Sequence, residues 1–436
     1  MALGGGNWTA QNKILPGTYI NFVSSVAVSS AVSDRGVVAM PLIMEWGPDE
    51  DVFEVTAEML QTQSLKIFGY PYEHAKLKGL RDLFLHAKSA YFYKLNNGVV
   101  ASSKYGTAKY TGALGNKIRI SVAANVDEPL KFDVKTFLEN TLVDEQIAIT
   151  RAELKNNDYV EFSPGLTLEE DAGTPMTGGA NGGSVTGTEY QAFLDKLESY
   201  NFNVLACTST TTEIKKLFAA FTKRLRDEVG LKFQTVLHQY STADYEGVIS
   251  VENDVTDSDA DLSDLVYWVA GLQAGCSVNK STTNEGYDGE YQVAVSYTQK
   301  QLAEALQSGK YMLHRVGSGI KVLDDINTLV TYTTEKGKDF ARNQVIRVLD
   351  QIAVDTATIF NNSFLGKIQN NESGRTSFWS SLVDHHKELE RLQAIDTFDT
   401  SNLVVTQGNS RQSIVVTDKV KPIDAMTHLY MTVTVN

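Results

Sequence analysis

The sequence predicts an α+β fold: an α/β-like core domain assembled from the N- and C-terminal halves, an inserted β-rich domain, and extended strand arms at both ends. Three observations support this. Apolar runs typical of buried strands alternate with amphipathic helices on both sides of a middle region, the middle region carries many short β-like runs, and the last residues alternate apolar and polar side chains. Because 436 residues exceed what one hydrophobic core usually spans, several domains are expected.

The first residues predict a strand arm. Residues 1–16 are rich in Gly, Asn and Gln, and they lead into a predicted strand at 18–23 in which Ile20 and Phe22 share one face. We therefore expect residues 1–24 to form an N-terminal arm.

The first part of the core is expected at residues 25–96. Residues 36–43 form a short apolar run typical of a central strand, residues 77–87 predict a helix, and residues 90–95 predict an aromatic strand. After Asn96 the composition changes, because turn residues begin to separate many short runs with strand patterns.

Those short runs predict an inserted β-rich domain at residues 97–187. They include residues 118–122, 131–134 and 159–162, and the Gly-rich stretch 173–187 is expected to be a flexible exit linker.

The chain returns to the core domain at residues 188–424. A buried strand at 202–206, an amphipathic helix at 214–225 and a second strand at 233–237 predict a β-α-β unit with a parallel strand pair. Farther on, the sequence predicts a hairpin around Gly317 to Gly319 and long helices at 339–360 and 378–392.

The final segment, residues 425–436, predicts a second strand arm. Leu429, Met431, Val433 and Val435 share one face, with no turn residue after them. Because chain ends usually fray, a terminal strand with an apolar face must pair with a sheet to be stable. The sheet can belong to its own chain or to a neighbouring subunit.

Composition excludes several classes of function. The formal charge of −14 is unlike that of proteins that coat nucleic acid, whose binding surfaces are basic. Two cysteines, Cys207 and Cys276, both expected to be buried, do not form a disulfide framework and indicate a reducing compartment. Without an apolar leader or a stretch of about 18 apolar residues, we expect a soluble, non-secreted chain with no membrane insertion.

Candidate metal and phosphate sites each fail at a named position. Residues 257–261 carry the alternating carboxylates of a calcium loop, but Leu262 occupies the glycine position and Trp268 the glutamate position. Thr210 and Glu213 open a helix after a buried strand, where a capping box explains their spacing better than catalysis does.

The remaining catalytic signals are also incomplete. His385 and His386 lie on a predicted helix without further metal ligands nearby, which favours a solvated helix face. Because no Gly-x-Ser-x-Gly or His-Glu-x-x-His sequence occurs either, we predict that the protein is not an enzyme and needs no catalytic, cofactor or metal site.

Five segments in the expected order resemble tail sheath proteins of contractile bacteriophage tails and of phage-tail-like bacteriocins, especially those of Gram-positive bacteria. They are LPGTYI (15–20), YTGALGNKI (110–118), AGLQAGCSVNKS (270–281), VLDDINTL (322–329) and KPIDAMTHLYMTV (421–433). This resemblance spans nearly the whole chain.

The resemblance implies a structural subunit that forms stacked hexameric rings, a helical homo-oligomer, around a tail tube. Contraction would drive the tube through the target bacterial envelope. The implied partners are the tail tube protein and the baseplate and tail terminator proteins, with neither nucleic acid nor a cofactor. The implied location is a virion tail or bacteriocin particle, assembled in the cytoplasm of the bacterial host.

The resemblance also implies sites. Strand exchange between subunits would use the two arms, through Thr18, Tyr19, Ile20, Phe22, Leu429, Tyr430, Met431, Thr432, Val433 and Val435. A tube-facing surface is expected on the helix at 377–392, with exposed Asp384, Lys387, Glu388, Glu390 and Arg391, or on the helix at 339–360; a simply solvated face is the alternative.

Two other classes of protein remain open at this point. A cytosolic α/β enzyme would need a convergent polar pocket, and another phage structural protein with closed symmetry would need no strand arms.

Overall fold

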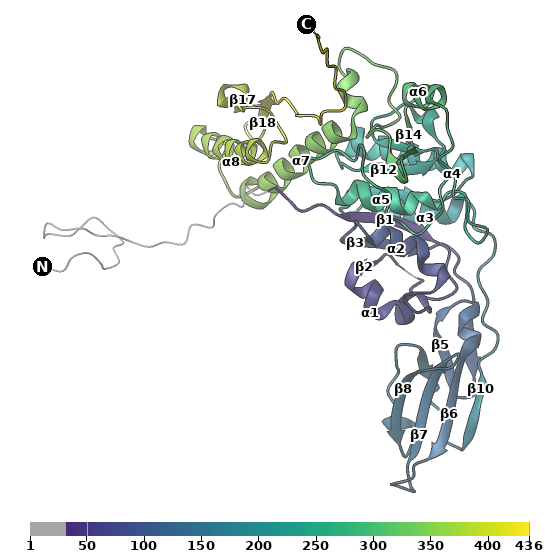
Figure 1. Cartoon of the computed structure of the whole chain (residues 1–436). Coiled ribbons are helices and arrows are strands. Elements are labelled where there is room, and N and C mark those ends of the chain that lie inside the picture. The colour runs from purple at the N-terminus through teal and green to yellow at the C-terminus, as the bar shows by residue number, and fades with distance from the viewer. Residues whose placement is uncertain (1–31, 50, 436) are drawn as a thin grey trace, which may run out of the picture. The chain divides into compact units, whose positions relative to one another are not determined.

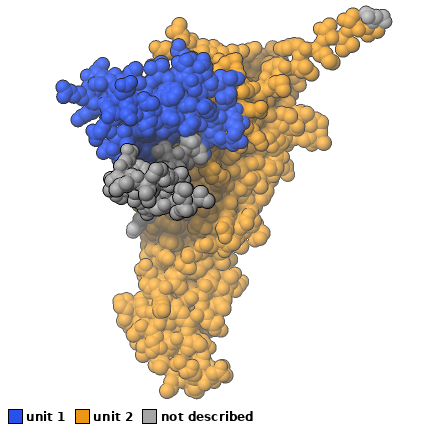
Figure 2. Space-filling view, turned by 90° about the vertical axis from the view of Figure 1, so that its left-hand side faces the viewer, with its two compact units in different colours: residues 1–32, 355–391, 397–420 blue, residues 33–354, 392–396, 421–436 orange. Residues whose placement is uncertain are grey.

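The computed structural model describes residues 32–49 and 51–435. The described chain divides into two compact units. The larger unit contains residues 33–354, 392–396 and those from 421 onward, and the smaller contains residues 355–391 and 397–420. Figure 1 labels the elements, and Figure 2 distinguishes the two units by colour.

A seven-stranded sheet forms the centre of the larger unit. In spatial order its strands are β14 (Lys310–Tyr311), β13 (Val248–Val251), β12 (Gln234–His238), β11 (Val204–Cys207), β1 (Val37–Leu42), β3 (Ser89–Lys94) and β2 (Phe53–Thr56). All neighbours are parallel except β2 and β3. Because β1 lies between β11 and β3, the sheet is assembled from both halves of the chain.

Helices cover both faces of this sheet. Val38 and Met40 of β1 belong to one core cluster and Ala39 to the other, because successive strand side chains point to opposite faces. The first cluster includes residues of α1 (Ala57–Phe68), α2 (Lys78–Phe84) and α5 (Leu265–Gly275). The second includes residues of α3 (Gly187–Leu197) and α4 (Thr212–Arg224). The central strands are therefore buried on both sides, as the continuous apolar runs predict.

Two of the sequence segments with family resemblance meet at a buried ion pair. Arg347, on α7 (Asn343–Ile359), lies 2.5 Å from Asp325, and the two side chains are 1% and 0% exposed. Gln273 of α5 accepts from Arg347 over 2.6 Å and donates to Asp325 over 2.9 Å. Burial alone would raise the pKa of Asp325, but the charge of Arg347 outweighs it and lowers that pKa. This network ties the start of α7 to α5.

The inserted domain is a sandwich of two antiparallel sheets. One contains β4 (Val100–Ser103), β5 (Gly106–Thr111) and β9 (Val160–Phe162), and the other contains β10 (Asp171–Pro175), β6 (Ile118–Ala124), β7 (Phe132–Leu138) and β8 (Thr141–Ala148). Inward side chains such as Ile118 and Val134 form their common core. Trp46 of the α/β core joins this cluster and stacks 6.0 Å from Tyr159, so an aromatic contact packs the inserted domain against the α/β core.

The larger unit also contains α6 (Gln299–Gln307) and the hairpin of β15 (Leu313–Val316) and β16 (Gly319–Val322). Short turns complete it: η1 (Ala75–Leu77), η2 (Ala113–Lys117), η3 (Arg151–Glu153), η4 (Leu225–Val229), η5 (Ser241–Ala243) and η6 (Lys338–Ala341).

The smaller unit packs helices against a β-hairpin. It includes the end of α7 from Asp355, the π-helical turn η7 (Phe360–Phe364), α8 (Glu372–Arg391), the turn η8 (Thr400–Asn402), β17 (Leu403–Gln407) and β18 (Ile414–Asp418). Its apolar core contains Ile359, Phe364, Phe378, Leu382, Val383 and Leu403. The indole of Trp379 donates to the carbonyl oxygen of Leu403 over 2.8 Å.

The predicted fold class is confirmed, including the parallel pair of β11 and β12. The sequence pattern did not predict α1 or β2, which follow one another without a turn between them. The predicted capping box at Thr210 is wrong, because α4 begins after Thr211 and has no side-chain cap. Capping boxes occur instead at Thr186 with Glu189 and at Thr298 with Gln301.

Candidate functional site

We define the C-terminal segment as residues 426–435. The residues immediately before it are held in the larger unit by backbone and side-chain contacts. Ile395 and Pro422 form an antiparallel bridge. The backbone N–H of Ala425 donates to Gln344 over 3.1 Å, and Arg342 pairs with Asp424 over 2.9 Å. The chain is therefore held in place up to Ala425.

The C-terminal segment itself exposes almost all of its apolar surface. Leu429, Met431, Val433 and Val435 are 87%, 75%, 71% and 90% exposed, and Tyr430 is 89% exposed. Within the described part of the chain, no backbone hydrogen bond or strand pairing involves these residues. Isolated apolar side chains are common on surfaces, but a row at strand spacing is the pattern of an interaction surface.

The hairpin of β17 and β18 has one covered face and exposed edges. Leu403, Val405, Ile414 and Val416 face the helices of the smaller unit. On the other face, Val404 and Val415 are 46% and 50% exposed. Among the described residues, β17 and β18 pair only with each other. Each strand therefore has one edge without a strand partner in the described chain, although the carbonyl of Leu403 accepts from Trp379.

His385 and His386 are buried, so the predicted solvated helix face is wrong. Both are 0% exposed. His385 Nε2 lies 2.8 Å from Asp355, and His386 Nε2 lies 2.9 Å from Asp418 of β18. The described residues contain no group of three metal-ligating side chains. The two histidines thus connect α8 to its neighbours within the smaller unit.

The charged residues predicted to face a tube lie on α8. Asp384, Lys387 and Arg391 are exposed, whereas Glu388 and Glu390 are half-buried. Glu388 pairs with Arg391 over 2.6 Å, and this pair holds the pKa of Glu388 below its usual value. α8 therefore presents a mixed charged face beside its buried row.

The other arm residues, Thr18, Tyr19, Ile20 and Phe22, lie outside the described residues. The described chain begins near the start of β1, where Gln351 donates to the hydroxyl oxygen of Ser33 over 2.7 Å.

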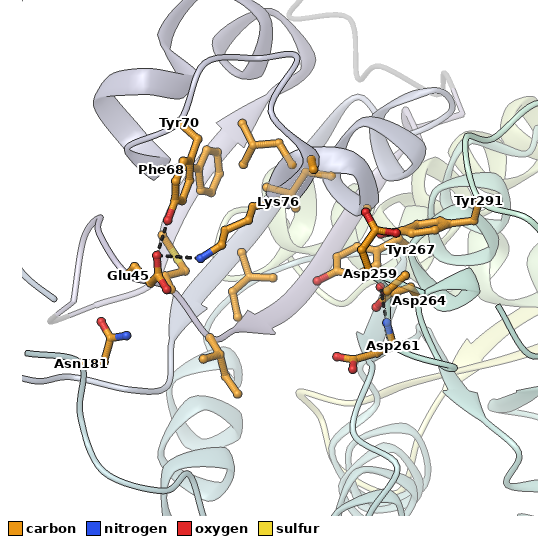
Figure 3. A pocket seen from close by; sticks show the side chains of 18 of the residues that line it. Glu45, Phe68, Tyr70, Lys76, Asn181, Asp259, Asp261, Asp264, Tyr267 and Tyr291 are labelled. Atoms are coloured by element: carbon orange, nitrogen blue, oxygen red, sulfur yellow. Dashed lines mark hydrogen bonds and ion pairs between the residues drawn. The ribbon is translucent and has the colours of Figure 1, made fainter. Parts of the chain in front are cut away.

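A cavity of about 710 Å³ lies at the carboxyl end of β1. Figure 3 shows Glu45, Tyr70 and Lys76 on one side of it and Asp259, Asp261 and Asp264 on the other. Lys76 lies 2.7 Å from Glu45, which also accepts a hydrogen bond from Tyr70. α/β sheets usually bind ligands at this edge, so an active site would be expected here.

The groups in this cavity do not form catalytic machinery. Burial would raise the pKa of Glu45, but hydrogen bonds from Lys76 and Tyr70 outweigh it and lower that pKa. Burial raises the pKa of Asp264 to about 6. Asp257, the first carboxylate of the calcium-like stretch, is engaged by Lys78 at 2.7 Å and by the backbone N–H of Gln292 at 2.6 Å. Neither a nucleophile with a base nor a metal site results among the described residues.

Cysteine burial differs from the prediction at one position. Cys207 is buried, which raises its pKa to about 12, whereas Cys276 is only half-buried.

The sequence pattern did not lead us to predict the hairpin of β17 and β18. Its signal is two runs of β-branched residues, 403–407 and 414–418, separated by polar turn residues.

The described residues thus combine an α/β core covered on both faces of its sheet, a β-sandwich insertion and an exposed C-terminal segment with a strand pattern, features that suit a protein which assembles with other subunits. Three family models match the chain. They describe the phage tail sheath β-sandwich domain at residues 96–181, the central domain at residues 183–328 and the C-terminal domain at residues 335–436.

Proteins with similar sequences align with nearly the whole chain. A protein of the phage-like element PBSX from Bacillus subtilis (strain 168) is 30% identical, with 99% of this chain and 100% of the relative covered. The crystal structure of the sheath tail protein of Desulfitobacterium hafniense is 37% identical with a TM-score of 0.82, covering 94% of this chain and 98% of that one. The sheath tail protein of Listeria innocua is 32% identical with a TM-score of 0.81, covering 91% and 93%.

The fold extends to more distant assemblies. A chain in the contracted helical sheath of the anti-feeding prophage has 12% sequence identity to this chain and a TM-score of 0.58, with 97% of this chain and 99% of that one covered. At this identity, the two chains are similar in fold alone. The chain belongs to the phage tail sheath protein family. It is a non-enzymatic tail sheath subunit of contractile tails or injection systems and a component of such particles. Among the described residues, no helix is both long and apolar enough to cross a bilayer.

Proposed function

We propose that this protein polymerises as stacked hexameric rings, in a helical lattice, around a tail tube, and that the lattice contracts to drive the tube through a bacterial envelope. The observation that carries this proposal is the C-terminal segment, whose apolar row is 71% to 90% exposed and finds no sheet among the described residues of its own chain. A row of this kind is suited to a sheet in another subunit.

Strand exchange would link neighbouring subunits. Leu429, Tyr430, Met431, Thr432, Val433 and Val435 of one subunit add as a strand to a sheet edge of the next, and the edges of β17 and β18 are suitable acceptors. Thr18, Tyr19, Ile20 and Phe22 would supply a second strand in the same way. Backbone hydrogen bonds contribute about 0.5 to 1.5 kcal/mol each, so one strand contributes a few kcal/mol to each link.

Repeated strand links suit a lattice that changes state. Contacts between different surfaces of identical subunits generate open helical assemblies. If the strand links persist while the compact units change their packing, a small free-energy difference per subunit adds up over many subunits. The strands would then keep neighbours connected during contraction.

The tube is the second partner in the proposal. Asp384, Lys387, Glu388, Glu390 and Arg391 on α8 provide a mixed charged face that complementary charges on a tube could hold weakly. Baseplate and terminator proteins would close the two ends of the polymer. The particle is a virion tail or a bacteriocin, assembled in the host cytoplasm.

Negative-stain electron microscopy of the purified protein tests this proposal directly. Long striated cylinders are expected for a sheath. Discrete particles of uniform size at every concentration would support a closed oligomer and would contradict the helical lattice.

A further inference from the structure

The loop that joins β6 to β7, residues 125–131, lies at one end of the inserted domain and is held by internal hydrogen bonds (Figure 1). The side chain of Asn125 accepts from the backbone N–H groups of Asp127 and Glu128 over 3.0 and 2.8 Å. It also donates to Asp133 over 2.6 Å, and the backbone N–H of Asn125 donates to the carbonyl of Lys131 over 2.9 Å. We call this loop the tip loop.

The tip loop presents two apolar side chains that nothing covers among the described residues. Val126 is 92% exposed and Leu130 is 83% exposed. Between them in the sequence, Asp127 has no ion-pair partner in the described structure, whereas Glu128 is paired with Lys131 at 2.6 Å. A preorganised loop of this kind loses little conformational freedom on binding, which favours a contact surface.

The outward face of the same domain carries a matching row across β6, β7 and β8. Arg119 lies opposite Phe137, which lies opposite Leu142. The guanidinium of Arg119 stacks 4.1 Å from the centre of the Phe137 ring, and Leu142 is 45% exposed. Arg119 has no ion-pair partner among the described residues. We call these three residues the outer row.

The two surfaces complement each other in polarity and charge. The tip loop offers two apolar side chains and a carboxylate without an ion-pair partner among the described residues. The outer row offers a leucine and the stacked pair of Phe137 and Arg119, whose guanidinium likewise has no described ion-pair partner. We propose that the tip loop of one subunit docks on the outer row of a second copy of this chain, with Asp127 facing Arg119. Because the two surfaces differ, the contact can repeat from copy to copy as an open series.

The small size of these surfaces also favours a second copy within a polymer. A stable independent complex buries about 800 Å² on each partner, far more than a few side chains provide. A weak contact becomes effective when strand links already hold the copies close together. This inference therefore rests on the proposed sheath polymer.

Cysteine cross-linking between differently tagged full-length chains tests the contact. One chain carries Leu130→Cys and the other Leu142→Cys, and they are co-assembled and mildly oxidised. We expect a cross-linked heterodimer in the polymer fraction, because a disulfide requires Cβ atoms within about 4.5 Å. A mixture of tagged wild-type chains controls for Cys207 and Cys276. Polymers without the cross-link would overturn this inference alone, whereas absence of polymers would contradict the proposed function.

A charge swap provides an independent test. Asp127→Arg or Arg119→Asp alone should raise the concentration needed for polymerisation about threefold. The chain with both substitutions should return to the wild-type value, because the new guanidinium on the tip loop of one copy would then meet the new carboxylate in the outer row of the next. If the two substitutions raise the polymerisation concentration of the double variant by the product of their separate effects, the two positions do not meet and the inference fails.

Discussion

Strand β1 and the C-terminal segment are both short and apolar, yet their environments are opposite. β1 pairs with β11 on one side and β3 on the other, and helices cover both of its faces. The C-terminal segment pairs with nothing among the described residues and exposes Leu429 and Val435 almost completely. This difference is the reason for our proposal that the first serves the fold of one subunit and the second serves contact with another.

Deletion of residues 429–436 should have the largest effect. We expect assembly to be abolished while the melting temperature stays near that of the full chain, because the described residues of this segment, 429–435, are exposed in their own subunit. Electron microscopy and thermal unfolding measure the two results.

A matched variant separates the apolar row from the backbone. Leu429→Ser, Met431→Ser and Val433→Ser together keep the length of the segment but remove its apolar face. We expect weakened rather than abolished assembly. Polymers of normal length from the deletion variant would refute the role of the segment.

In the core, Arg347→Met should be the most damaging single change. It leaves Asp325 as a buried, unpaired charge, so we expect the free energy of unfolding to fall by about 3 to 5 kcal/mol. Urea denaturation measures this loss. Combining Arg347→Met with Asp325→Leu should recover much of it, since no buried charge remains. Equal losses in the single and double variants would argue against the ion pair as the cause.

Charge reversal on α8 should act on a partner rather than on the fold. Glu388→Lys with Glu390→Lys should weaken co-assembly with the tube protein roughly tenfold at low salt. The ion pair of Glu388 and Arg391 lies at the surface and contributes little stability, so the free energy of unfolding should change only slightly. Glu304→Lys on α6 is a control on another helix. Unchanged tube co-sedimentation at low salt would count against a tube-facing α8.

The smallest expected effect is a pH dependence at Asp82. This carboxylate is 0% exposed and accepts from the backbone N–H of Glu290 over 2.8 Å, and burial raises its pKa to about 6. Because the folded pKa lies above the unfolded value, the folded state binds more protons between about pH 4 and 6.

The contribution of Asp82 to stability should therefore grow as the pH falls from 7 to 5. The free energy of unfolding of the wild type should gain on the order of 1 kcal/mol relative to Asp82→Asn over that range. Parallel urea titrations at both pH values measure the difference. A constant difference between the two proteins would show that Asp82 does not titrate there.

Much of the fold could be predicted because local signals were strong. The continuous apolar runs of β1 and β11 predicted buried central strands, and the spacing of Phe218, Phe221 and Leu225 predicted an amphipathic helix. By contrast, His385 and His386 were misjudged, because polar residues on a helix normally face solvent. Only the packing that brings Asp355 and Asp418 next to them makes their burial favourable.

The tertiary structure also decided which surfaces are available to partners. Leu142 and Arg119 look like ordinary strand residues in the sequence, and their common row arises from the pairing of three strands. The smaller unit likewise depends on contacts between side chains of η7, α8 and β17, which belong to three different elements of the chain. No local periodicity contains that information.

By itself, the sequence determined that the C-terminal segment has a strand pattern with one apolar face, because alternation at period two is a local property. The tertiary structure decided that no described part of the same chain completes that strand, because helices cover both faces of the central sheet and the segment pairs with none of its strands. Whether an apolar row is buried depends on which surfaces remain free after folding, and only the folded chain defines them.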